Sequence, residues 1–377
     1  MDVKPRRLVA FDTATGDRVA RVPGRWSVSE EHNGHGRIAV TSQWSREALA
    51  LKTWNRVAEA RTVLAVIEGT GRSETGGRVV CAGPVTDMDS DPKGFTINAA
   101  ASYSKRFEWL KLLNPALADT TIDGELLIDP DNPRPEWVWR REDASYEDIA
   151  ADMVDTGAFW AGGMPVTTPA REGGVNERTI NGWELHDIWS RIKLLTEIQN
   201  GIEVRFAPRM REDGGLDFDF EAAPELIRHY HVWNSTLPGQ RVQWAGTTRD
   251  ASGLASDVWA MAGKTEGVVL AARTVSTALT SIGWPVMQTS LTDNQSVTRL
   301  ETLKAHTNER ATRGSKRPEV YTFKVHRSWP LVTGDWVDVR IVHPAYEGYW
   351  ILTVKVLSID HDAGEWMTVK GRQRDGI

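Results

Sequence analysis

The sequence predicts a β-rich α+β fold in which two small, tube-like β-barrel domains flank α/β units in the middle of the chain. Three observations support this: strand-like alternation in residues 331–372, short strand-like runs in residues 8–100, and a long amphipathic helix followed by a hairpin between them. The 377 residues are enough for two to four domains at roughly 100–200 residues each. We expect an N-terminal β-barrel at 1–118, an α+β domain with an acidic loop at 119–240, and a helix plus second β-barrel at 241–377. The barrels are either contiguous or interleaved with the middle units.

Residues 331–372 show the alternation most clearly. Apolar side chains alternate with polar ones in two stretches, at Trp336, Val339 and Ile341 and at Val354, Val356 and Ile359. Alternation with period two, rich in Val, Ile and Trp, is typical of half-buried strands. Residues 360–364 contain Asp and Gly, which suit a hairpin turn. We therefore expect three antiparallel strands that form most of one side of a small barrel.

The N-terminal region, residues 8–100, reads as all-β. The apolar run Thr62–Ile67 has the length of one strand, and strands at 78–85 and 94–99 flank a turn rich in Asp. Short strands at such spacing are typical of a barrel or sandwich. A helix is expected at Ser104–Leu113, and the Asn-Pro pair that follows is expected to end it.

The middle of the chain predicts helices packed on a hairpin. Ser145 is an expected N-cap, and Gly157 is expected to end that helix. Glu184–Asn200 carries its apolar residues on one stripe and is the clearest helix in the sequence. It leads directly into a hairpin at Ile202–Phe220, so this part is an α+β unit.

The charge pattern argues against nucleic-acid binding as the main role. The formal net charge is −6 and the isoelectric point is about 5.9, whereas nucleic-acid-binding domains are basic. Residues 119–155 hold twelve Asp and Glu against three Arg. Asp123, Asp129 and Asp131 in this region could suggest a calcium site, but they lack the spacing of a calcium loop. We expect a solvated loop, or one that meets a basic partner surface.

A basic region follows near the C-terminus. A helix is expected at Ser296–Thr312 and a strand at Glu319–Val325, which leads into the terminal barrel. Residues 301–327 hold seven Lys and Arg against three Asp and Glu. Because residues 301–317, which hold five of these cations, contain no Phe, Tyr or Trp, we expect a surface that faces a partner or another subunit rather than nucleic acid.

The sequence also limits location and covalent chemistry. It has no run of eighteen apolar residues and no apolar segment behind its basic N-terminus, so we expect neither stable membrane insertion nor a secretory signal. Its single cysteine, Cys81, excludes an internal disulfide and a Cys-based zinc site. Cys81 lies in a strand-like apolar run, so it is expected to be a small buried side chain.

Two further groups of polar residues are candidates for a functional site. Asp217, Asp219 and Glu221 alternate with apolar residues, which is usual for the solvent face of a strand, although paired carboxylates can do acid–base work. His229 and His231 could place two imidazoles on one side of a strand, but the sequence shows no third ligand. The sequence contains no nucleophile elbow, P-loop or metal-binding cluster. We therefore predict no catalytic, cofactor-binding or metal site, and no enzymatic activity.

Tryptophan is unusually frequent, with seventeen in the chain. They are spread from Trp26 to Trp366 rather than clustered. Tryptophan can stack on sugars, but dispersed tryptophans are more typical of cores and subunit interfaces. We expect Trp336, Trp350 and Trp366 to serve packing and subunit contact.

Two hairpins far apart in the chain have similar sequences. Residues 89–97 (DSDPKGFTI) and 360–369 (DHDAGEWMTV) share D-x-D, a Gly-containing turn, an aromatic residue and a β-branched return strand. Val85 and Val356 each precede the first Asp by four residues, and both return strands end in small residues. Together with all-β regions at both ends of the chain, this suggests two related barrels. Three such chains around an axis would form a pseudo-sixfold ring.

The order of elements resembles the baseplate-hub, or tail-tip hub, family of long-tailed bacteriophages. The features that carry the resemblance are the N-terminal barrel, the helix Glu184–Asn200 running into its hairpin, and the later helix and strand. They are followed by the phrase Trp329–Val339 (WPLVTGDWVDV), which is similar to the strand entry of many hub and tail proteins. Within this group the chain most resembles the hub-like minor tail proteins of phages that infect Actinobacteria.

The resemblance implies a structural virion protein at the phage tail tip, assembled in the host cytoplasm. It implies a homotrimer that joins the sixfold tail tube to a threefold tip and lines a channel for the tape-measure protein and for DNA ejection. Its partners would be further copies of itself, distal tail and tail-tube proteins, the tape-measure protein, and tip or fibre proteins. Passing DNA would not be bound in a sequence-specific way, since an acidic lumen avoids counterion-releasing contacts.

Two other hypotheses remain open at this point. The excess of Trp and the many carboxylates would suit a tail protein that binds or hydrolyses polysaccharide, with Asp217 and Asp219 as the candidate acid–base pair. An adaptor or fibre-anchoring protein of another symmetry is the third hypothesis.

Overall fold

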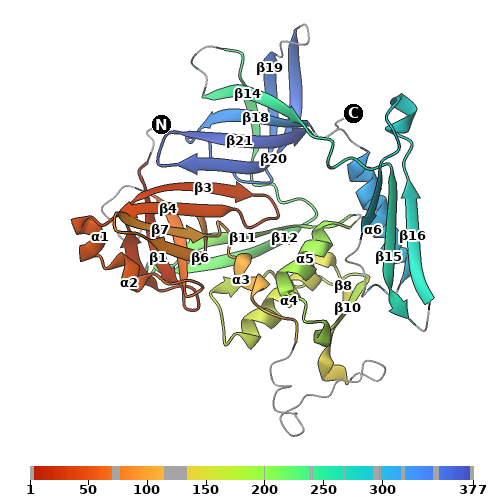
Figure 1. Cartoon of the computed structure of the whole chain (residues 1–377), viewed down its shortest axis with the longest axis horizontal. Coiled ribbons are helices and arrows are strands. Elements are labelled where there is room, and N and C mark those ends of the chain that lie inside the picture. Colours follow the sequence, from red (N-terminus) through yellow and green to blue (C-terminus); the bar gives the residue numbers. More distant parts are fainter. Residues whose placement is uncertain are drawn as a thin grey trace.

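A computed structural model describes residues 4–69, 77–113, 134–198, 200–237, 239, 241–265, 268–291, 297, 299–315, 319–342 and 348–373. One 13-stranded sheet runs through the molecule in the order β14-β18-β21-β20-β3-β4-β7-β6-β5-β1-β2, and β19 and β13 continue from β20 as a branch. In Figure 1 the C-terminal strands lie above the N-terminal strands, and the helices of the middle region lie below the C-terminal strands and to the right of the N-terminal ones.

The strands of this sheet come from both ends of the chain. From the N-terminal part they are β1 (Arg6–Asp12), β2 (Arg18–Val22), β3 (Arg25–Glu31), β4 (Arg37–Gln43), β5 (Thr62–Glu68), β6 (Arg78–Ser90) and β7 (Gly94–Ala99). From the C-terminal part they are β13 (Tyr230–Asn234), β14 (Val242–Arg249), β18 (Glu319–His326), β19 (Trp336–Val342), β20 (Tyr349–Asp362) and β21 (Trp366–Gln373). Two short helices, α1 (Arg46–Ala50) and α2 (Thr53–Arg56), lie between β4 and β5.

Strands β1 and β5 are buried on both faces. Leu64 and Val66 pack into one core with the other N-terminal strands, whereas Val63, Ala65 and Ile67 pack into a second core with the middle region. A strand that is covered on both sides needs apolar residues at every position rather than at every second one. This explains the continuous apolar run in the sequence.

The middle region packs three helices and two small sheets against the N-terminal strands. Its elements are α3 (Lys105–Glu108), β8 (Val138–Ala144), α4 (Tyr146–Trp160), β9 (Val166–Thr167), β10 (Asn176–Asn181), α5 (Ile188–Thr196), β11 (Glu203–Met210) and β12 (Leu216–Ala223), with short 3₁₀ turns at Pro135–Trp137 and Gly182–Glu184. An aromatic cluster holds it together. Tyr103 stacks on Phe218 at 4.1 Å between ring centroids, and Phe107 stacks on Phe206 at 5.1 Å. The predicted helix followed by a hairpin is confirmed in α5, β11 and β12.

The expected helix at Ser104–Leu113 was too long, and so was the one at Glu184–Asn200. Residues 110–112 instead pair with residues 186–188, through a bridge between Lys111 and Asp187 and backbone hydrogen bonds on either side of it. Asp187 then caps α5 by accepting a hydrogen bond from the backbone N–H of Ser190 at 2.8 Å. The helical pattern was therefore overridden by contacts between segments about 75 residues apart in sequence.

Gly157 does not end its helix, as the sequence suggested. Ser145 is the N-cap, and its hydroxyl accepts from the backbone N–H of Asp148, but α4 continues to Trp160. A Cβ on Gly157 would lie 2.5 Å from Cδ1 of Ile188 and 3.4 Å from the ring of Phe107. Glycine is needed there for the close approach of α4 to its neighbours rather than for a helix end.

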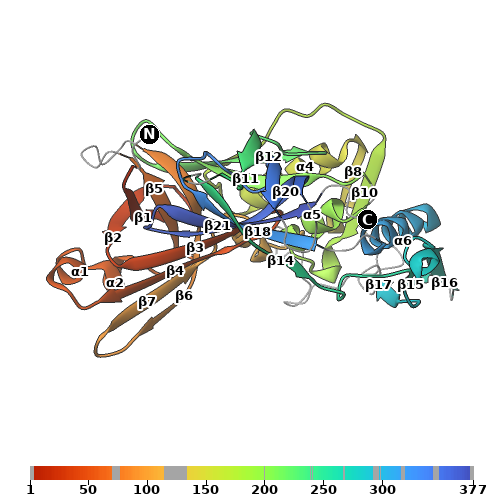
Figure 2. The ribbon, with the colours of Figure 1, turned by 90° about the horizontal axis from the view of Figure 1, so that it is seen from above.

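A separate small unit is inserted between β14 and β18. It consists of the sheet β16-β15-β17, formed by β15 (Asp257–Thr265), β16 (Val268–Val275) and β17 (Gln288–Leu291), a 3₁₀ turn at Thr280–Ile282, and the helix α6 (Leu300–Gly314) on one face. The helix was expected at Ser296–Thr312. Figures 1 and 2 both place this unit at the opposite end of the molecule from α1 and α2.

The β-rich α+β class is confirmed, but the two separate barrels are not. Over the described residues the main sheet runs open from β14 to β2, and none of the smaller sheets closes on itself. Within the same part of the chain no helix has the length and apolar character needed to cross a membrane.

Candidate functional site

The two halves of the main sheet contain the same five-stranded arrangement. We call β3, β4, β5, β6 and β7 the N-module, and β14, β18, β19, β20 and β21 the C-module. When the strands of each module are numbered by their order along the chain, they lie side by side in the order third, fourth, fifth, second, first. This gives β5-β6-β7-β4-β3 in the N-module and β19-β20-β21-β18-β14 in the C-module. Every neighbouring pair within both modules is antiparallel.

The modules also share local irregularities. The long strand β6 has a register shift between Val85 and Asp87, and β20 has one between Val356 and Ser358. The residues opposite the two valines are Ala99 and Gly371, both small. A bulge at the same position of the same strand is a specific feature, because bulges re-aim a strand and are positioned by the fold.

Strand pairing gives a residue-by-residue correspondence between the modules. Trp26 in the first strand of the N-module pairs with Val40, and Trp244 in the first strand of the C-module pairs with Phe323. Val40 and Phe323 in turn pair with Ile97 and Val369. The two tryptophans are therefore equivalent.

The strand pairing matches the residues of the two hairpins differently from their sequences at one position. Asp89 and Asp360 both pair with a threonine, at Thr96 and Thr368. The residue equivalent to Phe95 is then Met367, which is buried in its own core as Phe95 is, and not the exposed Trp366. The turn of the C-terminal hairpin is one residue longer, which the sequence comparison could not show.

The two modules are joined by strand pairing. The second half of β20 pairs antiparallel with β3, with Asp360 opposite Ser29 and His361 opposite Val28. The fourth strand of the C-module therefore meets the first strand of the N-module.

The equivalent edges at the other ends of the modules are open. Among the described residues, the second half of β6 pairs only with β7, and β14 pairs only with β18. Asp87 and Asp89 on β6 are exposed, as are Thr248 and Arg249 on β14. An open strand edge presents unpaired backbone groups and is a template for pairing with another chain.

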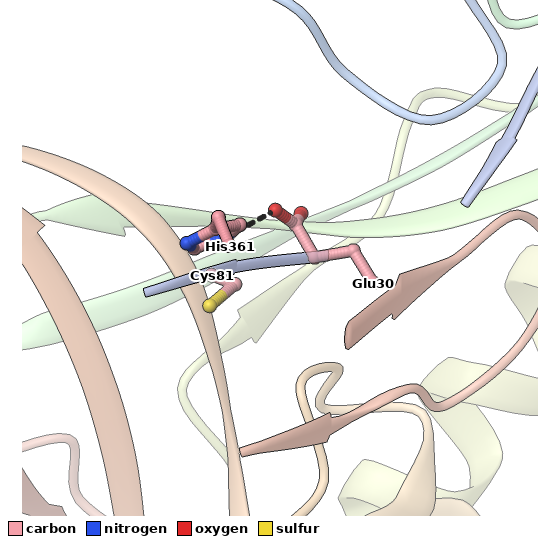
Figure 3. Close-up of side chains that lie close together, drawn as sticks. All are labelled: Glu30, Cys81 and His361. Atoms are coloured by element: carbon pink, nitrogen blue, oxygen red, sulfur yellow. Dashed lines mark hydrogen bonds and ion pairs between the residues drawn. The ribbon is translucent and has the colours of Figure 1, made fainter. Parts of the chain in front are cut away.

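A buried polar cluster lies at the joint between the modules (Figure 3). It consists of Glu30 on β3, Cys81 on β6 and His361 on β20. Nε2 of His361 donates to Oε1 of Glu30 at 3.0 Å. Nδ1 accepts from the guanidinium of Arg6 at 3.1 Å, because arginine can only donate.

This cluster superficially resembles a cysteine nucleophile with its histidine base. Both ring nitrogens of His361 are already occupied, and burial raises the pKa of the Cys81 thiol well above its usual value. The thiolate is the reactive form of cysteine, so Cys81 is not activated. The hydrogen bonds of His361 link β20 to β3 and to β1, and the expectation of a buried Cys81 is confirmed.

Glu203 connects the middle region to both modules. Its carboxylate accepts from Nζ of Lys355 on β20, lies 3.3 Å from Nε2 of His32 in the β3–β4 turn, and accepts from the backbone N–H of Leu226 at 2.8 Å. Burial raises the pKa of Glu203, but the His32 and Lys355 contacts and the Leu226 amide outweigh it and lower that pKa to about 2. Glu203 is therefore a charged link at the three-way junction.

The candidate carboxylates of β12 are neutralised by arginines. Arg209 lies 3.3 Å from both Asp217 and Asp219, and Glu221 is paired with Arg205 and Arg228. A glycosidase needs one carboxyl with a raised pKa beside a second one. Asp217 and Asp219 are instead both held by the same arginine, so this strand face weighs against the hydrolase hypothesis.

His231 lies on β13 and His229 directly precedes that strand, and their rings stack on each other as the prediction of two imidazoles on one side requires. The structure adds a third polar side chain. Asp335, at the entry to β19, places Oδ2 3.6 Å from Nδ1 of His229 and 3.6 Å from Nε2 of His231. Sequence reasoning missed it because Asp335 follows His229 by 106 residues. The signal in the sequence that could have pointed to Asp335 was the pair Gly334-Asp335 directly before a strand, where a conformationally flexible glycine precedes an acidic residue.

Other predicted features fall partly outside the described residues. Asp123, Asp129 and Asp131 lie outside them, and so does part of the basic region. Arg313 in that region is bound to Glu309 and to the carbonyl oxygen of Thr196. Of the three tryptophans expected to serve packing and contact, Trp336 is buried, whereas Trp350 and Trp366 are about two-fifths exposed, at 37% and 41%.

Comparison with known proteins gives a fold relationship. No protein-family model matches the sequence, and no curated protein matches it. Among solved structures, the chain is similar to the 43 kDa tail protein of prophage MuSo2 from Shewanella oneidensis, with 13% identity, coverage of 97% of this chain and 98% of that one, and a TM-score of 0.55. It is also similar to a tail protein from Neisseria meningitidis MC58, with 10% identity, coverage of 98% and 97%, and a TM-score of 0.56. Over nearly its whole length, the chain therefore has the fold of these two tail proteins.

Proposed function

We propose that this chain is a non-enzymatic structural subunit of a phage tail, and that three copies form a hub at the distal end of the tail. The observation that carries the proposal is the repeated five-stranded module, with one joint made within the chain and two complementary edges left open. The likeness in fold to two tail proteins supports the assignment to a virion tail.

The geometry of the joint suggests how copies associate. Within one chain, the fourth strand of the C-module pairs with the first strand of the N-module. If the same contact repeats, the fourth strand of the N-module, β6, pairs with the first strand of the C-module, β14, of the next copy. Such a head-to-tail contact makes a ring when its rotation closes. A ring of three chains then contains six modules, which suits a sixfold tube above and a threefold tip below.

The correspondence between modules fixes the register of this contact. Asp360 is equivalent to Asp89, since both pair with the equivalent threonine. Ser29 is equivalent to Thr248, since Ser29 pairs with the residue three before Val40 and Thr248, after a bulge in β14, pairs with the residue three before Phe323. The observed pair of Asp360 and Ser29 therefore predicts that Asp89 lies opposite Thr248 of the next copy.

We also propose a channel, partners, domains and a host for this hub. The ring lines a channel for the tape-measure protein and for passing DNA, and its other partners are tail-tube, distal tail and tip or fibre proteins. Two tube-like barrels, with domains at 1–118, 119–240 and 241–377, would be completed by strand pairing between copies. The phage would be a siphophage of Actinobacteria, and assembly would take place in the host cytoplasm.

The mass of the purified protein and its end-on image by electron microscopy test the proposal. We expect a particle of three chains, about 126 kDa from 42.0 kDa per chain, with a six-lobed outline and a central channel. A monomer at high protein concentration that also fails to assemble with tail-tube protein would contradict it.

A further inference from the structure

Three side chains from two distant segments converge beside β13. His229 and His231 stand two residues apart on one side of the strand, and Asp335 faces both from the start of β19. All three potential ligand atoms, Nδ1 of His229, Nε2 of His231 and Oδ2 of Asp335, lie within 4.8 Å of one another.

The carboxylate of Asp335 is held in place by the backbone. Oδ1 accepts hydrogen bonds from the amides of Arg228 at 3.0 Å and His229 at 2.9 Å, and Oδ2 accepts from the amide of Val332 at 3.0 Å. A carboxylate fixed in this way is a prepared oxygen ligand, because hydrogen bonds behind a ligand orient it for the metal.

The ring of His231 is fixed but its Nε2 is not satisfied. The ring is buried, stacks on His229 at 5.6 Å and contacts the edge of Trp329 at 5.5 Å between centroids. Among the described residues, Nε2 has no hydrogen-bond partner, and its 3.6 Å separation from Asp335 is too long for one. A buried polar nitrogen without a partner is costly, so it indicates a missing interaction.

The second histidine cluster of the molecule provides the contrast. In the cluster of Glu30, Cys81 and His361, both ring nitrogens of His361 are occupied, one by a carboxylate and one by an arginine. Neither nitrogen of His361 therefore has a lone pair free for a metal. Beside β13, Arg228 is the nearest cation in sequence, and its guanidinium is bound to Glu221 instead.

The spacing of the ligand atoms matches a tetrahedral site. Zinc bonds to histidine nitrogen and carboxylate oxygen are about 2.0–2.2 Å, which puts neighbouring ligand atoms of a tetrahedron about 3.3 Å apart. The two observed separations of 3.6 Å approach that value, and small side-chain rotations complete the fit. The side chain of His229 is 43% exposed, so an ion and a fourth ligand from water can reach the site.

We propose that His229, His231 and Asp335 bind one zinc ion. The ion would tie the segment before β13 to the entry of β19, and so fasten the middle region to the C-module. This role is structural and does not depend on the assembly state of the chain.

Zinc titration of the untagged full-length protein, stripped of metal with a chelator, tests the proposal. We expect one equivalent of Zn²⁺ per chain by calorimetry and a rise in melting temperature on saturation. With Co²⁺ as the probe, we expect the visible absorption of a tetrahedral site with nitrogen and oxygen ligands. His229→Gln should weaken binding by at least about tenfold, the lower end of losses seen when a metal site is disturbed.

Matched controls separate binding from folding. His186→Gln alters a histidine paired with Glu184 and should leave zinc affinity unchanged, as should Cys81→Ser in the other cluster. In chelator, His229→Gln should melt close to the parent temperature, because the side chain of His229 is outside the buried core. The absence of saturable binding at one ion per chain would overturn the proposal, and so would zinc affinity that is unchanged in both His229→Gln and Asp335→Asn.

Discussion

The N-module and the C-module have the same topology and the same bulge, yet they are packed differently. In the N-module, strand β5 is buried on both faces, between the sheet core and the middle region. In the C-module, the equivalent strand β19 is fully buried on one face, whereas on its other face Asp338 is half-buried and Arg340 and Val342 are exposed. What the modules share is the strand order, the bulge and the first-strand tryptophan, which define the module itself. What differs is set by the neighbours of each module.

The difference in packing predicts unequal dependence on equivalent core residues. Phe323 is fully buried in the C-module and its equivalent, Val40, is buried in the N-module. We expect Phe323→Ala to cost about 3–5 kcal/mol of unfolding free energy, and Val40→Ala about 2 kcal/mol, from the smaller apolar volume removed. Urea unfolding measures both, and Lys324→Ala, on the exposed face beside Phe323, is the control. Equal losses at the two core positions would show that the apolar volume removed does not determine the cost.

The charged contacts of Glu203, which connect the middle region to both modules, are expected to be lost in acid. The pKa of Glu203 is lowered to about 2 in the folded chain, against about 4.3 for an unperturbed glutamate. Its stabilising contribution is therefore complete above about pH 4.3 and lost as the pH falls toward 2. It amounts to roughly 3 kcal/mol at neutral pH by the free energy of one pKa unit.

Glu203→Gln should remove that contribution. We expect the variant to be less stable than the parent at pH 7 and equally stable near pH 2, measured by unfolding at a series of pH values. Glu47→Gln, an exposed glutamate in α1, is the matched control. A constant difference between Glu203→Gln and the parent at every pH would contradict the assigned ion pairs.

Substitutions of the small residues opposite the two bulges should destabilise the chain by different amounts and for different reasons. A Cβ on Gly371 would lie 3.0 Å from the carbonyl oxygen of Lys355 and 3.2 Å from Cβ of Val354. We expect Gly371→Ala to destabilise by about 1–3 kcal/mol through overpacking. Ala99→Gly, at the equivalent position, should cost only about 0.5–1 kcal/mol through backbone entropy. Thermal unfolding distinguishes these, and stabilisation by Gly371→Ala would mean that the bulge does not restrict this position.

The hairpin turns should show the smallest difference. Asp91 accepts hydrogen bonds from the amides of Lys93 and Gly94, at 2.7 and 2.8 Å, whereas Asp362 accepts from the amide of Gly364 at 2.7 Å. We expect Asp91→Ala to cost about 1–2 kcal/mol and Asp362→Ala about half as much, since the net value of one such bond is about 1 kcal/mol. A larger loss for Asp362→Ala in the same unfolding assay would reverse this comparison.

The sequence was informative wherever structure depends on neighbours in the chain. The hairpin at 202–220, the Ser145 cap and the D-x-D turns all follow from local spacing and turn chemistry, and the structure contains them. Local patterns were misleading where distant segments meet. Residues 110–112 looked helical but pair with residues 186–188.

The candidate sites follow the same division. Two histidines on one strand face could be predicted from alternation, whereas Asp335 reaches them only through the parallel pairing of β13 with β19. The pairing of β20 with β3 joins residues more than 320 positions apart, as in Asp362 opposite Ser27. No periodicity in the sequence encodes such a contact, and so the joint between modules had to be seen.

The central claim is that the contact between β20 and β3 repeats between chains as β6 against β14. Residues directly opposite each other in an antiparallel pair have Cα atoms about 4.5–5.5 Å apart, within the range for a disulfide. In a Cys81→Ser background, oxidation of Asp89→Cys/Thr248→Cys should give covalently closed trimers on a non-reducing gel. Asp89→Cys/Arg249→Cys, whose second side chain points to the opposite face of the strand, should give few cross-links. Exclusively monomeric Asp89→Cys/Thr248→Cys protein after oxidation, or equal cross-linking of both pairs, would contradict the claim.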